Sequence, residues 1–270
     1  MLFFLISCSG QDVGKVSLFD SLYGQQKLHL DLTYPFDSLY KTNNGEISAT
    51  ISVSSEVGTL MESSAITMNL RGKFRRMKCT MPPLMLNFKK STLKSMGLAN
   101  VDQMKLVTHC IDGKEGENNL EEELLLYQLY ESITPIAYRT IWVEVTYHDA
   151  DHPGSSIKTV GFLIEPDKVI SKRLGIEERK LFSLAQDSVF KASYGLAAAF
   201  NFMIGNRDWS VTASRNAKLF YEPDLGQYIV IPYDFDYSNI VGASYRRETL
   251  PKTMKHPFDR IYIGEYYALI

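Results

Sequence analysis

The chain has almost no net charge and no long apolar run. Its 29 Lys and Arg residues are balanced by 31 Asp and Glu, which leaves a formal charge of −2. A protein that binds nucleic acid or anionic membrane over its whole surface is usually basic, so neither partner is expected. The longest apolar candidate, Tyr194–Gly205, covers about 12 residues, short of the roughly 18 that span a bilayer. It therefore predicts a buried core helix.

Cysteine and histidine are scarce. The sequence holds 3 Cys and 5 His, without the close spacing that zinc sites require, so none of the histidines is assigned to a metal. Cys79 and Cys110 leave two interpretations open. They would form a disulfide in an exported protein, or remain as two free, buried thiols.

The remaining composition is that of an ordinary globular protein. Of 270 residues, 45% are apolar and 22% are charged. These proportions exclude a disordered chain, a collagen and a coiled-coil rod. The length suits one large domain or two lobes that share a cleft.

The first residues resemble the end of a bacterial lipoprotein signal. Met1–Ile6 is entirely apolar, and Leu5-Ile6-Ser7-Cys8 fits the pattern in which the cysteine is acylated. No basic residue precedes this run, so a hydrophobic N-terminal strand is the alternative. In the first interpretation residues 1–16 are a signal and tether, and the protein is lipid-anchored at Cys8 in the cell envelope, on the periplasmic or outer surface of a bacterium.

Residues 17–165 are predicted to be β-rich with one helix. Alternating or short apolar runs predict strands at Lys27–Thr33, Ile47–Val53, Ala65–Leu70, Leu84–Phe88, Lys105–Thr108, Tyr138–Tyr147 and Thr159–Ile164. A helix begins near Asn118 or Asn119 and ends at Pro135. Its apolar stripe consists of Leu126, Leu129, Tyr130 and Ile133.

Residues 166–270 show a different pattern from the β-rich residues 17–165. A long helix at Ala185–Ile204 leads into a polar loop, Gly205–Asn216. Two strands, Ala217–Tyr221 and Tyr228–Pro232, form a hairpin that ends at Tyr233–Asp236. Because a hairpin reverses the chain, we expect Asp234 to return near Asn216.

Asp234 and Asp236 are a candidate pair of metal ligands. With a spacing of two residues in an extended chain, both carboxylates point to one face. A hard divalent cation relieves their repulsion, and Asp with the amide oxygen of Asn suits Mg²⁺. The alternative is a pair of solvated carboxylates at strand ends.

Seven segments between about Leu28 and Ser238 carry a resemblance to a known family. They are LRGKFRR, MPPLMLNFKK, KLVTHC, LEEELLLYQLYESITPIAYRTIWVEVTY, VGFLIE, GNRDWSVTASRN and VIPYDFDYS. In this order they resemble the spore-coat protein H (CotH) kinases and their secreted bacterial relatives. The resemblance implies an α+β, two-lobed protein-kinase-like fold, with a β-rich N-lobe over residues 17–165 and a shortened helical C-lobe over residues 166–270.

The resemblance also implies roles for the acidic cluster. Asp208 would orient or deprotonate an acceptor hydroxyl, and Asn216 and Asp234 would hold the Mg²⁺ or Mn²⁺ ions that bridge the phosphates of ATP. Asp236 would assist the metal site or stabilise its loop. Glu165, at the end of a strand, would lie beside adenine, with a solvated strand end as the alternative. Seven residues separate Asp208 from Asn216, where many protein kinases have four.

The phosphate-binding residues are less constrained. Glu123 lies toward the apolar stripe of its helix, so it needs a cation unless it only complements the helix dipole. Lys105 opens the preceding strand and is the preferred partner, with Lys78 and Lys89 as rivals. Arg71 begins a basic run to Lys78, five of whose eight residues are Lys or Arg. The run suits a polyphosphate or a solvated loop.

Three functions remain open from the sequence. The first is an exported kinase that transfers the ATP γ-phosphate to a protein hydroxyl. The second is a non-catalytic pseudokinase or binding-module lipoprotein on the same scaffold. The third is a metal-dependent hydrolase that uses Asp234 and Asp236. No Gly-rich nucleotide loop or Walker A motif is present, and no oligomer is implied.

Overall fold

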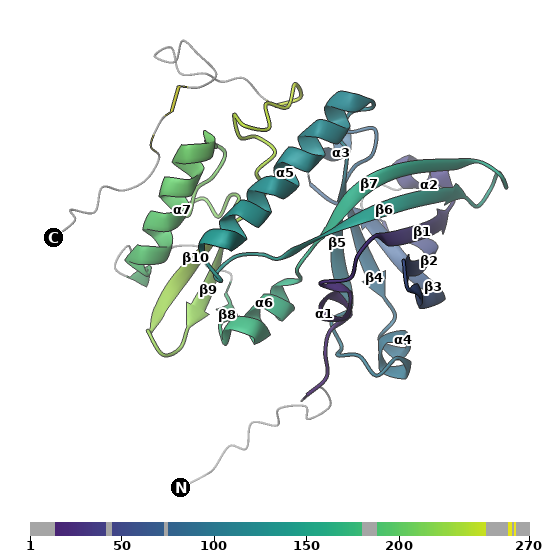
Figure 1. The fold of residues 1–270 in the computed structure, drawn as a ribbon, viewed down its shortest axis with the longest axis horizontal. Coiled ribbons are helices and arrows are strands. Elements are labelled where there is room, and N and C mark those ends of the chain that lie inside the picture. The colour runs from purple at the N-terminus through teal and green to yellow at the C-terminus, as the bar shows by residue number, and fades with distance from the viewer. Residues whose placement is uncertain are drawn as a thin grey trace, which may run out of the picture.

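The computed structural model describes residues 14–41, 45–72, 75–179, 188–246, 259–260 and 262 (Figure 1). The strands are β1 Leu28–Tyr34, β2 Ile47–Ser55, β3 Gly58–Leu70, β4 Leu84–Phe88, β5 Gln103–Thr108, β6 Thr140–Asp149, β7 Ser156–Ile164, β8 Glu177–Glu178, β9 Ala217–Glu222 and β10 Gln227–Pro232. The helices are α1 Leu18–Leu22, α2 Phe36–Lys41, α3 Arg75–Lys78, α4 Lys90–Ser95, α5 Lys114–Ile133, α6 Asp167–Leu174 and α7 Lys191–Ile204. Within these ranges, no helix is long and apolar enough to cross a membrane.

Seven strands form a closed barrel in the order β1-β2-β3-β4-β5-β7-β6. Neighbouring strands are antiparallel except β1 and β6, whose parallel pairing closes the sheet. Buried residues alternate along β1, where Leu28, Leu30 and Leu32 are at most 1% exposed. Because successive side chains of a strand point to opposite faces, these leucines enter the barrel core, which Leu93 of α4 also joins.

Helix α5 lies between the barrel and a smaller C-terminal layer (Figure 1). Tyr127 of α5 packs on Phe162 of β7, with ring centroids 5.6 Å apart. Tyr130, one turn further along, packs on Phe200 of α7 at 4.8 Å. The C-terminal layer consists of a three-stranded sheet in the order β10-β9-β8, with α7 packed against β10. These contacts make α5 the shared wall between the two parts.

The prediction of a two-lobed protein-kinase-like fold with a helical C-lobe is wrong. The β-rich part is a closed barrel, and the described chain after Glu165 has only two helices, of 8 and 14 residues, beside its three strands. The strands expected from the sequence do form. An alternating pattern predicts a strand but does not specify its partners, so the parallel pairing of β1 with β6 was not visible in the sequence.

The buried face of α5 also differs from the predicted apolar stripe. Leu126 and Tyr130 are buried, but Leu129 and Ile133 are 38% and 49% exposed. The buried face instead includes Glu123, which is 3% exposed. The helix therefore directs a carboxylate, and not only apolar side chains, toward the interior where the C-terminal hairpin ends.

Candidate functional site

The β9–β10 hairpin places Asp234 beside Asn216. Ala217 pairs with Pro232 at the end of the hairpin, and the Tyr233 amide donates to the Asn216 carbonyl at 3.1 Å. Asn216 and Asp234 both have positive φ, 49° and 63°. Asn and Asp adopt this left-handed conformation more readily than other residues with a side chain, so it suits the turns at these two positions.

Asp208 joins these two residues from the loop after α7. The Asn216 side-chain amide donates to the Asp208 carbonyl at 2.6 Å and to its carboxylate at 3.0 Å. Burial and the neighbouring charge of Asp234 raise the pKa of the Asp208 carboxyl, while Arg215 and Asn216 act in the opposite direction. The structure therefore brings Asp208, Asn216 and Asp234 into one cluster.

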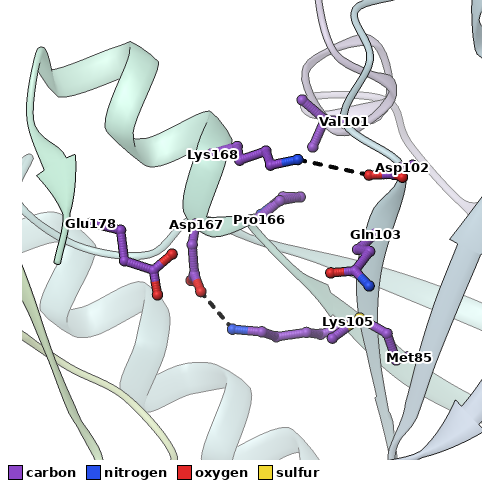
Figure 2. A pocket seen from close by; sticks show the side chains of 9 residues that line it. All are labelled: Met85, Val101, Asp102, Gln103, Lys105, Pro166, Asp167, Lys168 and Glu178. Carbon is purple, nitrogen blue, oxygen red and sulfur yellow. Dashed lines mark hydrogen bonds and ion pairs between the residues drawn. The ribbon is translucent and has the colours of Figure 1, made fainter. Parts of the chain in front are cut away.

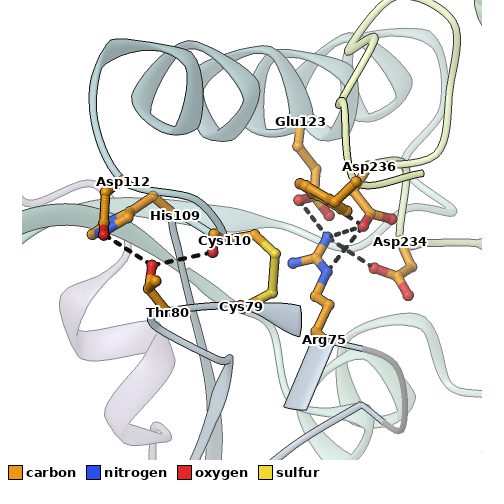
Figure 3. The surroundings of a disulfide bond; sticks show 10 residues. Arg75, Cys79, Thr80, His109, Cys110, Asp112, Glu123, Asp234 and Asp236 are labelled. Carbon is orange, nitrogen blue, oxygen red and sulfur yellow. Dashed lines mark hydrogen bonds and ion pairs between the residues drawn. A yellow bond between two sulfur atoms is a disulfide. The ribbon is translucent and has the colours of Figure 1, made fainter. Parts of the chain in front are cut away.

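Arg75 lies at the centre of a second, overlapping acidic group (Figure 3). Its Nη2 is 2.9 Å from Glu123 Oε2, 2.8 Å from Asp236 Oδ2 and 3.4 Å from Asp234 Oδ1. Its Nε also donates to Asp236 Oδ2 at 3.0 Å. The cation that pairs with Glu123 is thus Arg75, not Lys105 as expected. Lys105 lies on β5 and reaches a different carboxylate.

The carboxylates around Arg75 differ in exposure. The Asp234 side chain is 42% exposed, whereas those of Glu123 and Asp236 are 4% and 2% exposed. Burial raises the pKa of the Glu123 carboxyl and raises that of Asp236 well above its usual range, although Arg75 opposes both shifts. Of the three, Asp234 is the carboxylate that a ligand in solvent can reach.

The acidic group has the donor chemistry of a hard divalent cation site. Carboxylate oxygens of Glu123, Asp234 and Asp236 lie within 4.8 Å of one another, and Asp236 Oδ1 is buried without a hydrogen-bond partner. Carboxylate and amide oxygens are the ligands that Mg²⁺ and Mn²⁺ prefer. Arg75 already compensates Glu123 and Asp236, so the donors that best fit an added cation are those of Asp234, Asp208 and Asn216.

A cationic cluster faces this site from β5 and β9. Lys105 Nζ lies 3.4 Å from Asp167 Oδ1, and 5.4 and 5.8 Å from the ring centroids of Tyr138 and Tyr233. Lys218 Nζ lies 2.9 Å from the other oxygen of Asp167. Burial lowers the pKa of the Lys105 ammonium. Burial alone would raise the pKa of the Asp167 carboxyl, but Lys105 and Lys218 reverse this effect and hold that pKa at about 2.

Arg71 connects the two charged clusters. Burial lowers the pKa of its guanidinium, and its charge interacts with Asp234 on one side and Lys105 on the other. A small polar pocket opens beside Lys105 (Figure 2). It is lined by Met85, Val101, Asp102, Gln103, Lys105, Pro166, Asp167, Lys168 and Glu178.

Glu165 does not line that pocket. It is 0% exposed and accepts hydrogen bonds from Arg139 and Arg173, with closest distances of 2.7 and 2.9 Å. It is therefore neither the adenine neighbour nor the solvated strand end that the sequence left open. Glu165 is a buried anion that pairs with Arg139 and Arg173 at the end of β7.

The structure decides between the two interpretations of Cys79 and Cys110, a disulfide or two free thiols. Cys79 and Cys110 form a disulfide with an S–S distance of 2.06 Å. Cys8 lies outside the described residues, as does the apolar run before it. The lipid anchor therefore stays a prediction.

Sequence reasoning missed three charged residues of the site. Arg75 belongs to the basic run that begins at Arg71, but nothing in that run distinguishes one arginine from another. Asp167 directly follows Pro166 in the first turn of α6, a position that had only suggested the end of a strand. Lys218 lies on β9 two residues after Asn216, and its spacing gave no signal, because Asn216 precedes the strand and has a positive φ.

Comparison with known proteins assigns no family. No protein-family model matches the chain, and no curated protein matches it. The resemblance to the spore-coat protein H kinases therefore stays a prediction.

Proposed function

We propose that the protein is an exported, metal-dependent phosphotransferase that uses ATP and a protein hydroxyl as substrates. The observation that carries this proposal is the convergence of Asp208, Asn216 and Asp234, with the buried guanidinium of Arg71 close enough to interact with the charges of both Asp234 and Lys105. Transfer of a phosphoryl group depends mainly on positioning and on neutralising charge. A site that combines metal-ligand oxygens with buried cations has the parts for both.

Each residue has a distinct role in the proposal. Asp234 and Asn216 bind Mg²⁺ or Mn²⁺ through side-chain oxygens, and Arg71 and Lys105 contact the phosphates. The cation, when bound, neutralises charge on the phosphate oxygens. Asp208 accepts a hydrogen bond from the acceptor hydroxyl and orients its oxygen. The raised pKa of this half-buried carboxyl favours a base that works nearer neutral pH.

Export is supported by the disulfide. Structural disulfides persist in oxidising compartments and are rare in reducing ones. The Cys79–Cys110 bond therefore agrees with a location in the cell envelope. Anchoring through an acylated Cys8 belongs to the same proposal, and mass spectrometry of the membrane-extracted protein tests it.

The first experiment is thermal melting of the full chain with ATP and Mg²⁺ or Mn²⁺. A ligand that binds only the folded state, at about 100 times its Kd, adds about 2.7 kcal/mol of stability. The expected result is a rise of several degrees in Tm that requires the metal. Asp234→Ala should abolish the rise, because Asp234 is the proposed metal ligand and the exposed carboxylate around Arg75.

Asp224→Ala is the matched control. Asp224 is an exposed residue in the turn between β9 and β10, at the opposite end of the same hairpin. This variant should keep the full ligand-dependent rise. If the wild-type protein, correctly folded, shows no shift with either metal, the phosphotransferase proposal is rejected.

A non-catalytic nucleotide-binding or anion-binding protein is the second candidate. The observation that favours it is the pairing of Arg75 with Glu123 and Asp236, which leaves fewer uncompensated carboxylates for metal ions. Transfer from radiolabelled ATP to protein acceptors separates the two. Binding without transfer, unchanged by Asp208→Asn, supports the second candidate.

A further inference from the structure

Helix α3 holds Arg75 but is too short to be stable alone. It consists of the four residues Arg75–Lys78, whereas isolated helices shorter than about 12 residues are marginal in water. Its position therefore depends on tertiary contacts. Those contacts decide where the Arg75 guanidinium lies relative to the acidic group.

The disulfide is the covalent contact that fixes this helix. Cys79 directly follows α3, and its amide donates to the Arg75 carbonyl at 2.8 Å. Its partner Cys110 lies in the segment between β5 and α5, and the Thr80 amide donates to the Cys110 carbonyl at 2.9 Å. Figure 3 shows the disulfide beside the Arg75 cluster. The bond therefore ties α3 to the segment that leads into α5.

The same segment is closely packed against the start of α5. A Cβ added to Gly116 would lie 1.8 Å from the Ile111 carbonyl oxygen, so only glycine fits there. The start of α5 and the Cys110 segment thus hold a fixed spacing, and α5 carries Glu123 two turns further on. This chain of contacts links the disulfide to both Arg75 and Glu123.

Arg75 in turn holds the segment after β10. Its guanidinium contacts Asp236 through two nitrogens and Asp234 through one. Asp236 is almost fully buried, so its contact is fixed, while Asp234 remains half-exposed at the edge of the cluster. A guanidinium in this place neutralises the buried carboxylates, while the half-exposed carboxylate of Asp234 lies near enough to Asp208 for their charges to interact.

We propose that Arg75 is the positioning residue for the metal ligand Asp234, and that the Cys79–Cys110 disulfide keeps Arg75 in place. This inference rests on the proposed function for its consequence in metal binding. Its structural part, the dependence of residues 233–238 on the disulfide, is measurable without any ligand.

The experiment compares four proteins: wild type, Cys79→Ala with Cys110→Ala, Arg75→Lys and Leu93→Ala. Leu93 of α4 is 0% exposed in the barrel core, and α4 and α3 lie at opposite ends of the barrel (Figure 1). Leu93→Ala therefore destabilises the protein at a place away from α3. Two quantities are measured at low temperature on folded protein. One is hydrogen exchange of residues 233–238, and the other is the Kd for ATP with Mn²⁺ and with EDTA.

The cysteine variant should exchange faster at residues 233–238, with exchange in β2 and β3 unchanged. Both it and Arg75→Lys should bind ATP at least tenfold more weakly with Mn²⁺, and equally well with EDTA. Leu93→Ala should retain the wild-type ratio of the two Kd values. A changed ratio of the two Kd values in the first two variants, with an unchanged ratio in Leu93→Ala, distinguishes positioning of a metal ligand from general destabilisation.

The inference is overturned if residues 233–238 of the cysteine variant exchange hydrogen at the wild-type rate. If that variant does not fold, an unchanged Mn²⁺-dependent Kd in Arg75→Lys, which retains the disulfide, overturns it equally. Faster exchange in a protein whose wild type binds no ATP supports the anchoring of Arg75 and rejects the proposed function. The two failures are therefore distinguishable.

Discussion

The side-chain amide of Asn216 binds both the carbonyl and the carboxylate of Asp208, at 2.6 and 3.0 Å. The seven residues between them form a closed loop, since Ser210 and Arg215 exchange backbone hydrogen bonds of 2.8 and 2.9 Å. A loop longer than that of many protein kinases therefore still brings the two side chains together. The contact also makes the ionisation of Asp208 depend on residue 216.

Asn216→Asp should raise the pKa of Asp208 further. The substitution replaces a hydrogen-bond donor with a carboxylate, and neighbouring like charges disfavour ionisation. In the proposed reaction Asp208 acts ionised, so transfer is lost as the pH falls through its pKa. The acidic limb of the rate profile should move upward by about 1 pH unit. Asn118→Asp, an exposed change in the first turns of α5, should leave the profile in place; an identical profile for Asn216→Asp would contradict the prediction.

Asp167→Asn should destabilise the protein in a pH-dependent way. The pKa of Asp167 is lowered from 3.8 to about 2 by Lys105 and Lys218, against the effect of burial. A carboxyl with a lowered folded-state pKa contributes stability that is complete above about pH 4 and is lost toward pH 2. The shift corresponds to about 2 kcal/mol.

Urea denaturation of wild type and Asp167→Asn between pH 3 and pH 7 measures this difference. The gap between the two unfolding free energies should be largest at pH 7 and should narrow as the pH falls below 4. Asp224→Asn, in the exposed hairpin turn, should show no such gap. A gap that stays constant with pH would show that Asp167 acts by packing and not by charge.

Removal of the Cys79–Cys110 disulfide should lower the free energy of unfolding by about 3–4 kcal/mol. The cysteines are 31 residues apart, and closing a loop of this length restricts the unfolded chain by about that amount. Urea denaturation of the Cys79→Ala and Cys110→Ala double variant measures the loss. A loss below about 1 kcal/mol would mean that the reduced, unfolded chain is already compact around this loop.

Glu165→Gln should affect stability and not ligand binding. Removing the charge of Glu165 leaves Arg139 and Arg173 without their buried anion, and breaking a buried ion pair costs roughly 3–5 kcal/mol. The Kd for ATP, measured on folded protein, should not change. Glu178→Gln is the contrasting variant, in which the Kd for ATP should change. Glu178 lines the pocket beside Lys105 and contacts Lys218 at 2.6 Å. Weaker ATP binding in Glu165→Gln, with stability retained, would return Glu165 to the nucleotide site.

Local elements were predictable because their signals are local. The alternation of Leu28, Leu30 and Leu32 specified β1, and Pro223 to Gly226 specified the turn between β9 and β10. From that turn follows the approach of Asp234 to Asn216, since a hairpin of known ends pairs known residues. Of the two interpretations that the sequence left open for Glu123, the structure selects the buried carboxylate that pairs with a cation.

The identity of that cation was not predictable. Arg71, Arg75, Lys78 and Lys105 have the same charge, and their distances from Glu123 depend on where α3 and β5 pack against α5. Only the tertiary structure selects Arg75 for Glu123 and directs Lys105 to Asp167.

By itself, the sequence determined most of the strands, the presence of two long helices, the hairpin and the supply of carboxylates at its end, because periodicity and turn chemistry act over a few residues. It did not fix where the helices start, since α5 begins at Lys114 and α7 at Lys191. Tertiary structure alone decided the closure of the barrel through β1 and β6, the disulfide, the burial of Glu165 and the grouping of acids around Arg75. Each of these joins segments far apart in the chain. Such contacts depend on how whole faces pack, and no local pattern of residues encodes them.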